Sequence, residues 1–236
     1  MSEFRRRCLL HAMKYGKGDM VIEVSKPTTF TITENGVERV VALSTGINRL
    51  PHLDKVDTFK FADKDALLSF DGGGLEILNC ENLFESFKNV TSIKNVVIKS
   101  NIGSFVFRGC DKLKYISTIY SLSTHTWTTF MWCKSLEFIQ AIGYQPRKYR
   151  FIDVRYSPIT KECLDYIYDH IDKEVVNRPE VFSGIWLRHD RYVELATIAY
   201  QKKWMRYGVQ LWDADKKAEE NSEYCNKLFN DGIIKP

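Results

Sequence analysis

Apolar residues recur in the middle of the chain, three residues apart within short motifs and 23 residues apart between motifs. The clearest copies are FRGCDKLKYI at 107–116 and FMWCKSLEFI at 130–139, and weaker copies begin at Phe84 and Phe61. Four positions recur in each copy, and 15 of these 16 positions are apolar, with Lys64 the exception. A fixed period near 23 predicts a solenoid, in which each unit is too small to close its own core and is covered by its neighbours.

The four repeated positions predict the buried core of this region. Phenylalanine occupies the first position in all four copies, cysteine the second in the last two, and mainly leucine and isoleucine the third and fourth. Cys110 and Cys133 are predicted to act as small buried hydrophobes, with a metal-binding or redox pair as the alternative. The predicted core residues are Phe61, Phe84, Phe107, Phe130, Cys110, Cys133, Leu113, Leu136, Ile116 and Ile139.

The motif F-x2-C-x2-L-x2-I at a period of 23 resembles the BspA-type leucine-rich repeat over residues 61–145. The resemblance implies that each coil contributes one strand to a parallel sheet and that the protein acts by binding other macromolecules. Lys64 stands where the family has cysteine or a small residue, which implies a modified first coil. The expected fold class is α+β, a short leucine-rich-repeat solenoid of about four coils with a cap at each end.

A hairpin is predicted on the N-terminal side of the repeat. TTFTITENGVERVVAL at 28–43 alternates apolar and polar residues around Asn35-Gly36, the strongest short signal for a two-residue turn. MVIEV at 20–24 predicts a third strand beside it. These segments are expected to form a β cap over the first coil, because a bare solenoid end would expose apolar surface.

The C-terminal side changes to helical spacing. Apolar residues predict helices at 159–171, with Thr160 as N-cap, and at 191–204. Short apolar stretches predict strands at 184–187 and 209–212. The predicted divisions are a basic N-terminal arm (1–18), a β-hairpin cap (19–60), the solenoid (61–150) and an α/β C-terminal cap (151–236).

The positive charge lies at one end of the chain. Residues 1–18 carry the whole net charge of +4, and the 29 basic and 29 acidic residues that follow cancel. A nucleic-acid-binding protein usually has a basic stripe on its folded body, so contact with nucleic acid is expected only through the arm. Arg5, Arg6 and Arg7 are predicted to dock in an acidic groove of a neighbouring subunit, with contact to packaged nucleic acid or a disordered arm as the alternatives.

The chain shows no membrane-spanning run and a poor secretion signal. No stretch approaches 18 apolar residues, so no membrane insertion is expected. FRRRCLLHAM resembles the start of a signal peptide, but its apolar run is short and is broken at His11 and Lys14. The six cysteines form no CxxC pair and are therefore predicted to be free thiols.

Catalytic motifs are scarce. The five histidines show no recognised metal-binding spacing. His189, Asp190 and Glu194 are predicted to form a solvated helix start, with a catalytic or metal-binding role as the alternative. DGGG at 71–74 lacks the residues that complete a phosphate-binding loop and predicts a turn with positive φ. We therefore expect no catalytic residue, no cofactor and no metal.

Aromatic residues accompany the last two predicted coils. They lie beside or between the core positions, where aromatic side chains are typical binding anchors. Packing against the C-terminal cap is the alternative. The residues predicted to bind a partner in this way are Tyr115, Tyr120, Trp127, Trp132 and Tyr144.

Both ends of the chain resemble phage proteins. The opening SEFRRRCLL is similar to the F-R-R-R start of proteins from phages of gut Bacteroidetes. An SPIT helix start followed by A-x-x-K-x-W is similar to the C-terminal end of repeat proteins in such phages and prophages. These resemblances imply a virion protein associated with the head or tail.

The expected function is that of a non-enzymatic structural component of a tailed bacteriophage particle. It would bind neighbouring virion subunits or a host surface and belong to a larger oligomer. The alternative is a bacterial BspA-like surface adhesin or receptor module, which predicts export. An enzyme with a small catalytic domain at 151–236 is disfavoured, because that segment offers few convergent polar groups.

Overall fold

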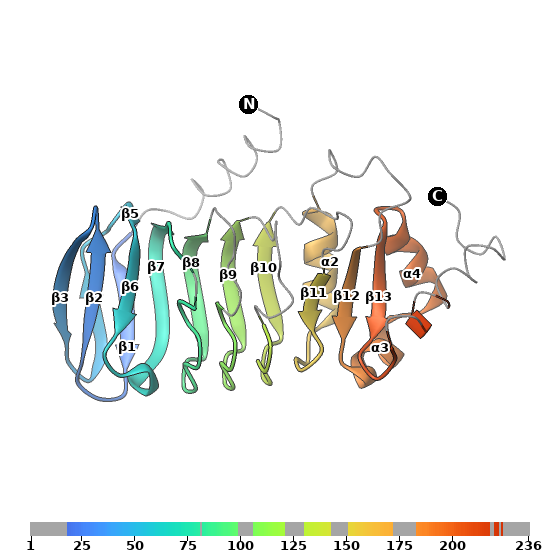
Figure 1. Ribbon diagram of the computed structural model, residues 1–236, viewed down its shortest axis with the longest axis horizontal. Helices are drawn as coiled ribbons and strands as arrows, with labels where there is room; N and C mark the ends of the chain where they lie inside the picture. Colours follow the sequence, from blue (N-terminus) through green and yellow to red (C-terminus); the bar gives the residue numbers. More distant parts are fainter. Residues whose placement is uncertain are drawn as a thin grey trace, which may run out of the picture.

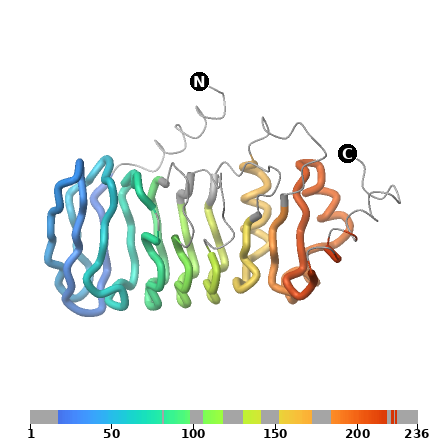
Figure 2. The backbone as a smooth tube through the Cα atoms, in the orientation of Figure 1, coloured from blue at the N-terminus to red at the C-terminus, as the bar shows by residue number. Residues whose placement is uncertain are grey.

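The computed structural model describes residues 18–80, 82–98, 106–120, 130–142, 151–171, 183–217, 220, 221 and 223. These residues form three sheets whose strands stand side by side along the long axis of the molecule, so the protein is a rod (Figure 1). From residue 67 onward the backbone advances strand by strand along this rod, as the colour gradient in Figure 2 shows, whereas residues 20–61 run back and forth at the other end. Segments that are close in sequence are therefore mostly close in space.

One end of the rod is a three-stranded antiparallel sheet in the order β3-β2-β6. Strands β2 (Thr28–Glu34) and β3 (Val37–Leu43) confirm the predicted hairpin. Asn35 and Gly36 connect them with φ of 51° and 76°, the left-handed pair that a two-residue turn between twisted strands requires. The third strand is β6 (Thr58–Phe61), which pairs with β2.

The central sheet contains seven strands in the order β10-β9-β8-β7-β1-β4, with β5 also paired to β7. The predicted strand MVIEV is confirmed as β1, but it pairs with β4 and β7 instead of joining the hairpin. The reason is its buried face of alternate apolar residues, which faces the core of this larger sheet. The strands are β1 (Met20–Val24), β4 (Gly46–Leu50), β5 (Lys55–Val56), β7 (Leu67–Ile77), β8 (Ser92–Ile98), β9 (Tyr115–Tyr120) and β10 (Phe138–Ile142).

The predicted fold class, a leucine-rich-repeat solenoid of about four coils between two caps, is wrong. The molecule is a sheet-rich protein with strands divided among three sheets, and the largest sheet is mixed rather than wholly parallel. The predicted first coil begins at Phe61, yet Phe61 ends β6 and pairs with Phe30 in the antiparallel sheet. The first half of β7 pairs antiparallel with β1, and only the two-residue strand β5 continues the parallel pairing beside its second half.

The 23-residue period has a different origin in the pairing register of β7, β8, β9 and β10. Phe70 pairs with Ile93, Ile93 with Ile116, and Ile116 with Ile139. Each pair is 23 residues apart, and all four side chains are buried. The sequence pattern thus reflects one parallel register repeated across neighbouring strands.

A row of phenylalanine rings fills the core beneath these strands. The rings of Phe84 and Phe107 are stacked at 5.6 Å between centroids, and those of Phe107 and Phe130 at 5.7 Å. Phe61 does not join this row; its ring contacts Phe87 edge to face at 5.7 Å. All ten predicted core residues are nevertheless buried.

A bulge at DGGG divides β7 into two halves. The register between β7 and β8 shifts between Asp71 and Leu75. The first half pairs with β1 and the second half with β5. Gly73 has a φ of 59°, and its carbonyl oxygen accepts a hydrogen bond from the Gly18 N–H at 3.1 Å. The predicted positive φ is therefore present, and it belongs to a bulge within a long strand.

The other end of the rod is a parallel three-stranded sheet with helices packed near it, in the strand order β11-β12-β13. The predicted helix at 159–171 is confirmed as α2, and Thr160 Oγ1 caps it by accepting from the Cys163 N–H at 3.2 Å. The predicted strands at 184–187 and 209–212 are also confirmed. The elements are β11 (Phe151–Val154), β12 (Ser183–Leu187), β13 (Val209–Asp213), α2 (Lys161–Asp169), α3 (His189–Leu195) and α4 (Ile198–Met205).

The single helix predicted at 191–204 is wrong, because the structure has two helices there. Thr197 has extended backbone angles, and its side chain accepts a hydrogen bond from the Tyr200 N–H, so it begins α4 as an N-cap. Strand β11 has no counterpart among the sequence predictions. No helix of the described chain is long and apolar enough to cross a membrane.

Candidate functional site: an exposed tryptophan turn

Three turns that precede neighbouring strands each contain a residue in the left-handed conformation. These residues are Ser86, Gly109 and Trp132, with φ of 64°, 74° and 62°. The Ser86 N–H donates to the carbonyl oxygen of Arg108 at 2.7 Å, and the Gly109 N–H to that of Met131 at 2.8 Å. The hydrogen bonds between adjacent turns therefore hold the same unusual backbone conformation at intervals of 23 residues.

Trp132 is the residue least suited to this position. Glycine adopts positive φ freely, whereas a bulky side chain does so rarely and at a cost of about 1–3 kcal/mol. Trp132 is nevertheless not a core residue, since 40% of it is exposed. Strained residues of this kind occur most often at binding and active sites, so Trp132 marks a candidate site.

Trp132 lies in a row of charged and aromatic side chains, which we call the tryptophan row (Glu85, Arg108, Trp132 and Tyr156). The guanidinium carbon of Arg108 lies 4.5 Å from the centroid of the Trp132 ring. Arg108 Nη1 is 3.8 Å from Glu85 Oε1, and the Tyr156 ring is 6.5 Å from Trp132. Tyr156 is also exposed.

The chemistry of the tryptophan row suits binding. Exposed tryptophan, tyrosine and arginine side chains contribute most of the affinity in many protein interfaces. A cation held over an indole ring stabilises the arrangement by about 0.5–1 kcal/mol at an exposed site. The row contains no nucleophile paired with a base, so its groups recognise a surface better than they could catalyse a reaction.

Tyr115 is placed differently from Trp132. It is half-buried, its ring stacks on Phe138 at 5.5 Å, and its hydroxyl donates to Gln140 Oε1 at 3.1 Å. Phe138 in turn lies 5.6 Å from Tyr166 of α2. Tyr115 thus belongs to an aromatic series that packs toward α2, the alternative that the sequence left open.

The side chains of the other predicted binding residues lie outside the part of the chain that the structure describes. Tyr120 ends β9, but its side chain is not among the described parts. The residues that lie wholly outside the described ranges are Arg5, Arg6, Arg7, Trp127 and Tyr144.

The two repeated cysteines use their thiols inside the core. Cys110 Sγ donates to the carbonyl oxygen of Phe84 at 3.0 Å, and Cys133 Sγ to that of Phe107 at 2.9 Å. Burial raises the pKa of Cys110 to about 12 and that of Cys133 well above its usual value. Both thiols therefore stay protonated at neutral pH, which fits small buried residues better than metal ligands.

His189, Asp190 and Glu194 lie in α3 but do not converge. The Asp190 carboxylate forms two hydrogen bonds with Arg188, at 2.6 and 2.7 Å, and Glu194 pairs with Arg191. His189 instead contacts the carboxylate of Asp213, the last residue of β13, and that of Asp215, which follows the strand. Within the described ranges these three are the one group of histidine, cysteine or acidic side chains whose possible ligand atoms all lie within 4.8 Å of one another.

Sequence reasoning missed Asp213 and Asp215. The available signal is the pair of aspartates in DAD at 213–215, directly after the last predicted strand. Comparison with protein-family models, curated proteins and solved structures finds no match to the chain.

Proposed function

We propose that the protein is a non-enzymatic interaction protein and a structural component of a tailed bacteriophage particle. Its tryptophan row binds a neighbouring virion subunit or a host surface. The observation that carries the binding role is Trp132, a bulky residue held in a left-handed conformation while 40% exposed. Folding alone gives no reason to retain tryptophan where Ser86 and Gly109 fill the equivalent positions.

The shape of the molecule supports a structural role. Strands of all three sheets follow one another along a single axis, so the rod can separate contacts at its two ends (Figure 1). The turns that carry the tryptophan row are joined by backbone hydrogen bonds, which present Arg108 and Trp132 on a fixed framework. A pre-organised surface loses less entropy when it binds.

The assignment to a phage particle rests on the resemblance of SEFRRRCLL and of the C-terminal motifs to phage proteins. Purified particles of the parent phage should contain this polypeptide in a constant number of copies. Mass spectrometry of particles separated by density gradient measures this. Particles that lack the polypeptide would show that the virion assignment is wrong.

Trp132→Gly is expected to separate binding from folding. Glycine relieves the left-handed strain but loses the contact with Arg108, so the free energy of unfolding should change by less than about 1 kcal/mol. Incorporation of the protein into particles, or attachment of those particles to host cells, should fall at least tenfold, because a central tryptophan typically contributes about 2 kcal/mol or more. Urea denaturation and quantitative particle assays measure the two effects.

Ser86→Gly is the matched control, because it makes the same backbone change at the equivalent position without removing an aromatic ring. It should leave both incorporation and attachment unchanged. Normal incorporation and attachment of Trp132→Gly particles would contradict the binding role of the tryptophan row.

A further inference from the structure

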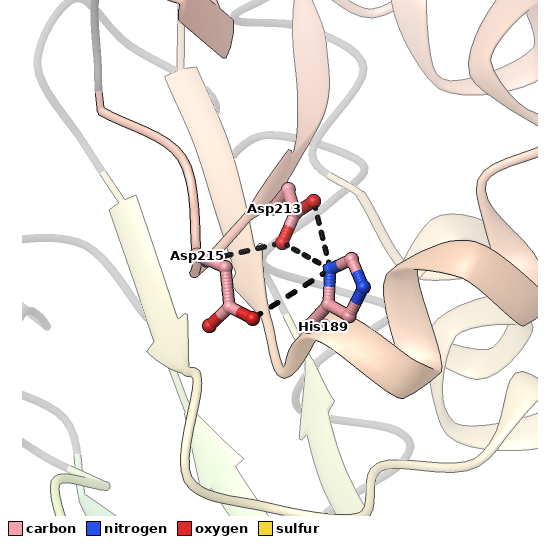
Figure 3. Close-up of side chains that lie close together, drawn as sticks. All are labelled: His189, Asp213 and Asp215. Carbon is pink, nitrogen blue, oxygen red and sulfur yellow. Dashed lines mark hydrogen bonds and ion pairs between the residues drawn. The ribbon is translucent and has the colours of Figure 1, made fainter.

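We propose that His189, Asp213 and Asp215 bind one divalent transition-metal ion, with zinc as the representative metal. Figure 3 shows the three side chains directed toward one another. His189 Nδ1 lies 3.0 Å from Asp213 Oδ2 and 3.8 Å from Asp215 Oδ2. One ligand atom from each residue lies within 4.8 Å of the other two.

The fold places these residues together at the carboxyl edge of a parallel sheet. Leu187 and Asp213 are register partners on β12 and β13, and His189 follows Leu187 by two residues. The backbone of Asp213 is fixed by Asn221: the Asp213 N–H donates to Asn221 Oδ1 at 2.9 Å, and Asn221 Nδ2 donates to the Asp213 carbonyl at 3.0 Å. The buried ligand is therefore positioned before any ion arrives.

The charge of the group calls for a cation. The Asp213 side chain is only 2% exposed, and a buried carboxylate is costly unless it is paired. Among the described residues its one ion-pair partner is His189, and its Oδ1 also accepts a hydrogen bond from the Asp215 N–H at 3.1 Å. The Asp215 carboxylate adds a second negative charge beside the same nitrogen. Two carboxylates exceed the charge of one imidazole even when it is protonated, whereas a divalent ion with neutral imidazole balances them.

A second buried aspartate, Asp153, shows how a buried carboxylate is usually neutralised within a protein. Asp153 is 3% exposed, and it accepts hydrogen bonds from Arg155 Nε at 2.9 and 3.0 Å. A guanidinium thus neutralises Asp153 permanently. No lysine or arginine of the described chain takes that place at Asp213, which indicates that the compensating cation comes from solution.

The donor set favours a transition metal over magnesium or calcium. Imidazole nitrogen with carboxylate oxygen suits zinc and its neighbours, whereas magnesium and calcium prefer oxygen ligands alone. Ligand atoms about 2.0–2.1 Å from a tetrahedral zinc lie about 3.3 Å apart. The distances from His189 Nδ1 to the two carboxylates, 3.0 and 3.8 Å, lie on either side of this value. His189 and Asp215 are exposed, so an ion can enter from solvent and retain an open position for a further ligand.

The test is zinc titration of the full-length protein, prepared without a histidine tag and treated with a chelator. Isothermal titration calorimetry should show one zinc ion bound per chain. Asp215→Asn should weaken binding at least tenfold, and His189→Ala should abolish it. Asp215 is 71% exposed on its side chain, so its substitution keeps the protein folded, which circular dichroism verifies.

His52→Ala is the matched control. His52 Nε2 also lies 3.1 Å from a carboxylate, that of Asp54, but among the described residues it belongs to no three-residue group of this kind. Zinc binding should be unchanged in this variant. The proposal is overturned if the wild-type protein binds no zinc, or if Asp215→Asn binds zinc as tightly as the wild type. Neither result bears on whether the protein is in a phage particle.

Discussion

Replacing Phe107 with alanine is expected to lower the free energy of unfolding by about 3–5 kcal/mol, enough to unfold a marginally stable domain. The ring is fully buried and lies between those of Phe84 and Phe130 at 5.6 and 5.7 Å. Alanine would leave a cavity that neighbouring strands cannot close without shifting the parallel register. Urea denaturation followed by circular dichroism measures the loss.

Lys64→Ala supplies the comparison for Phe107→Ala. Lys64 occupies a repeated position, but its Nζ donates to the carbonyl oxygen of Glu85 at the surface. Loss of this exposed contact should cost less than about 1 kcal/mol. Small and equal effects of the two substitutions would show that the phenylalanine row is not the main source of stability in this region.

Gly73→Ala is expected to be the next most destabilising change, at about 3 kcal/mol. A Cβ atom at this position would overlap the carbonyl oxygen of Gly18 and lie 2.8 Å from that of Asp19. Both obstacles are backbone atoms. They can move only if the contact between β7 and the segment before β1, which contains Gly18 and Asp19, opens. The left-handed φ of 59° adds about 1 kcal/mol of strain.

Gly36→Ala separates the two causes. Gly36 has a φ of 76°, yet no atom lies within 4 Å of a Cβ placed there. This variant should lose only the conformational component, about 1 kcal/mol. If thermal and urea denaturation give the same loss for both variants, close packing at Gly73 contributes nothing to stability.

Local sequence signals predicted the elements at both ends of the rod well. Asn35-Gly36 specifies its turn through backbone angles alone, and Thr160 specifies a helix start through one side-chain hydrogen bond. Such signals act over a few residues and need no tertiary information. The break between α3 and α4 was missed because the apolar spacing continues past Thr197, although its cap is a local signal too.

The repeat misled the prediction of fold class for a physical reason. A period of 23 specifies how β8, β9 and β10 pair, but not which strands lie beyond β7. Phe61 continues the spacing in sequence while its strand is antiparallel. A periodic pattern therefore fixes a local register, and the fold also depends on strands outside the pattern.

The candidate sites were predictable to different degrees. Trp132 was found from its aromatic character, but its left-handed backbone, shared with Gly109, was not predicted. The group formed by His189, Asp213 and Asp215 was missed because its members are brought together by parallel pairing of β12 and β13. His189 and Asp213 are 24 residues apart in sequence, and their contact follows only from the order of the strands.

The shared register of β8, β9 and β10 gives the gene a simple way to change the length of the molecule. Duplicating one 23-residue segment would insert one more strand, because both of its new neighbours would match it. The spacing between paired strands implies a gain of about 4.8 Å for each added segment. The number of 23-residue segments would therefore set the distance between the two ends of such a molecule.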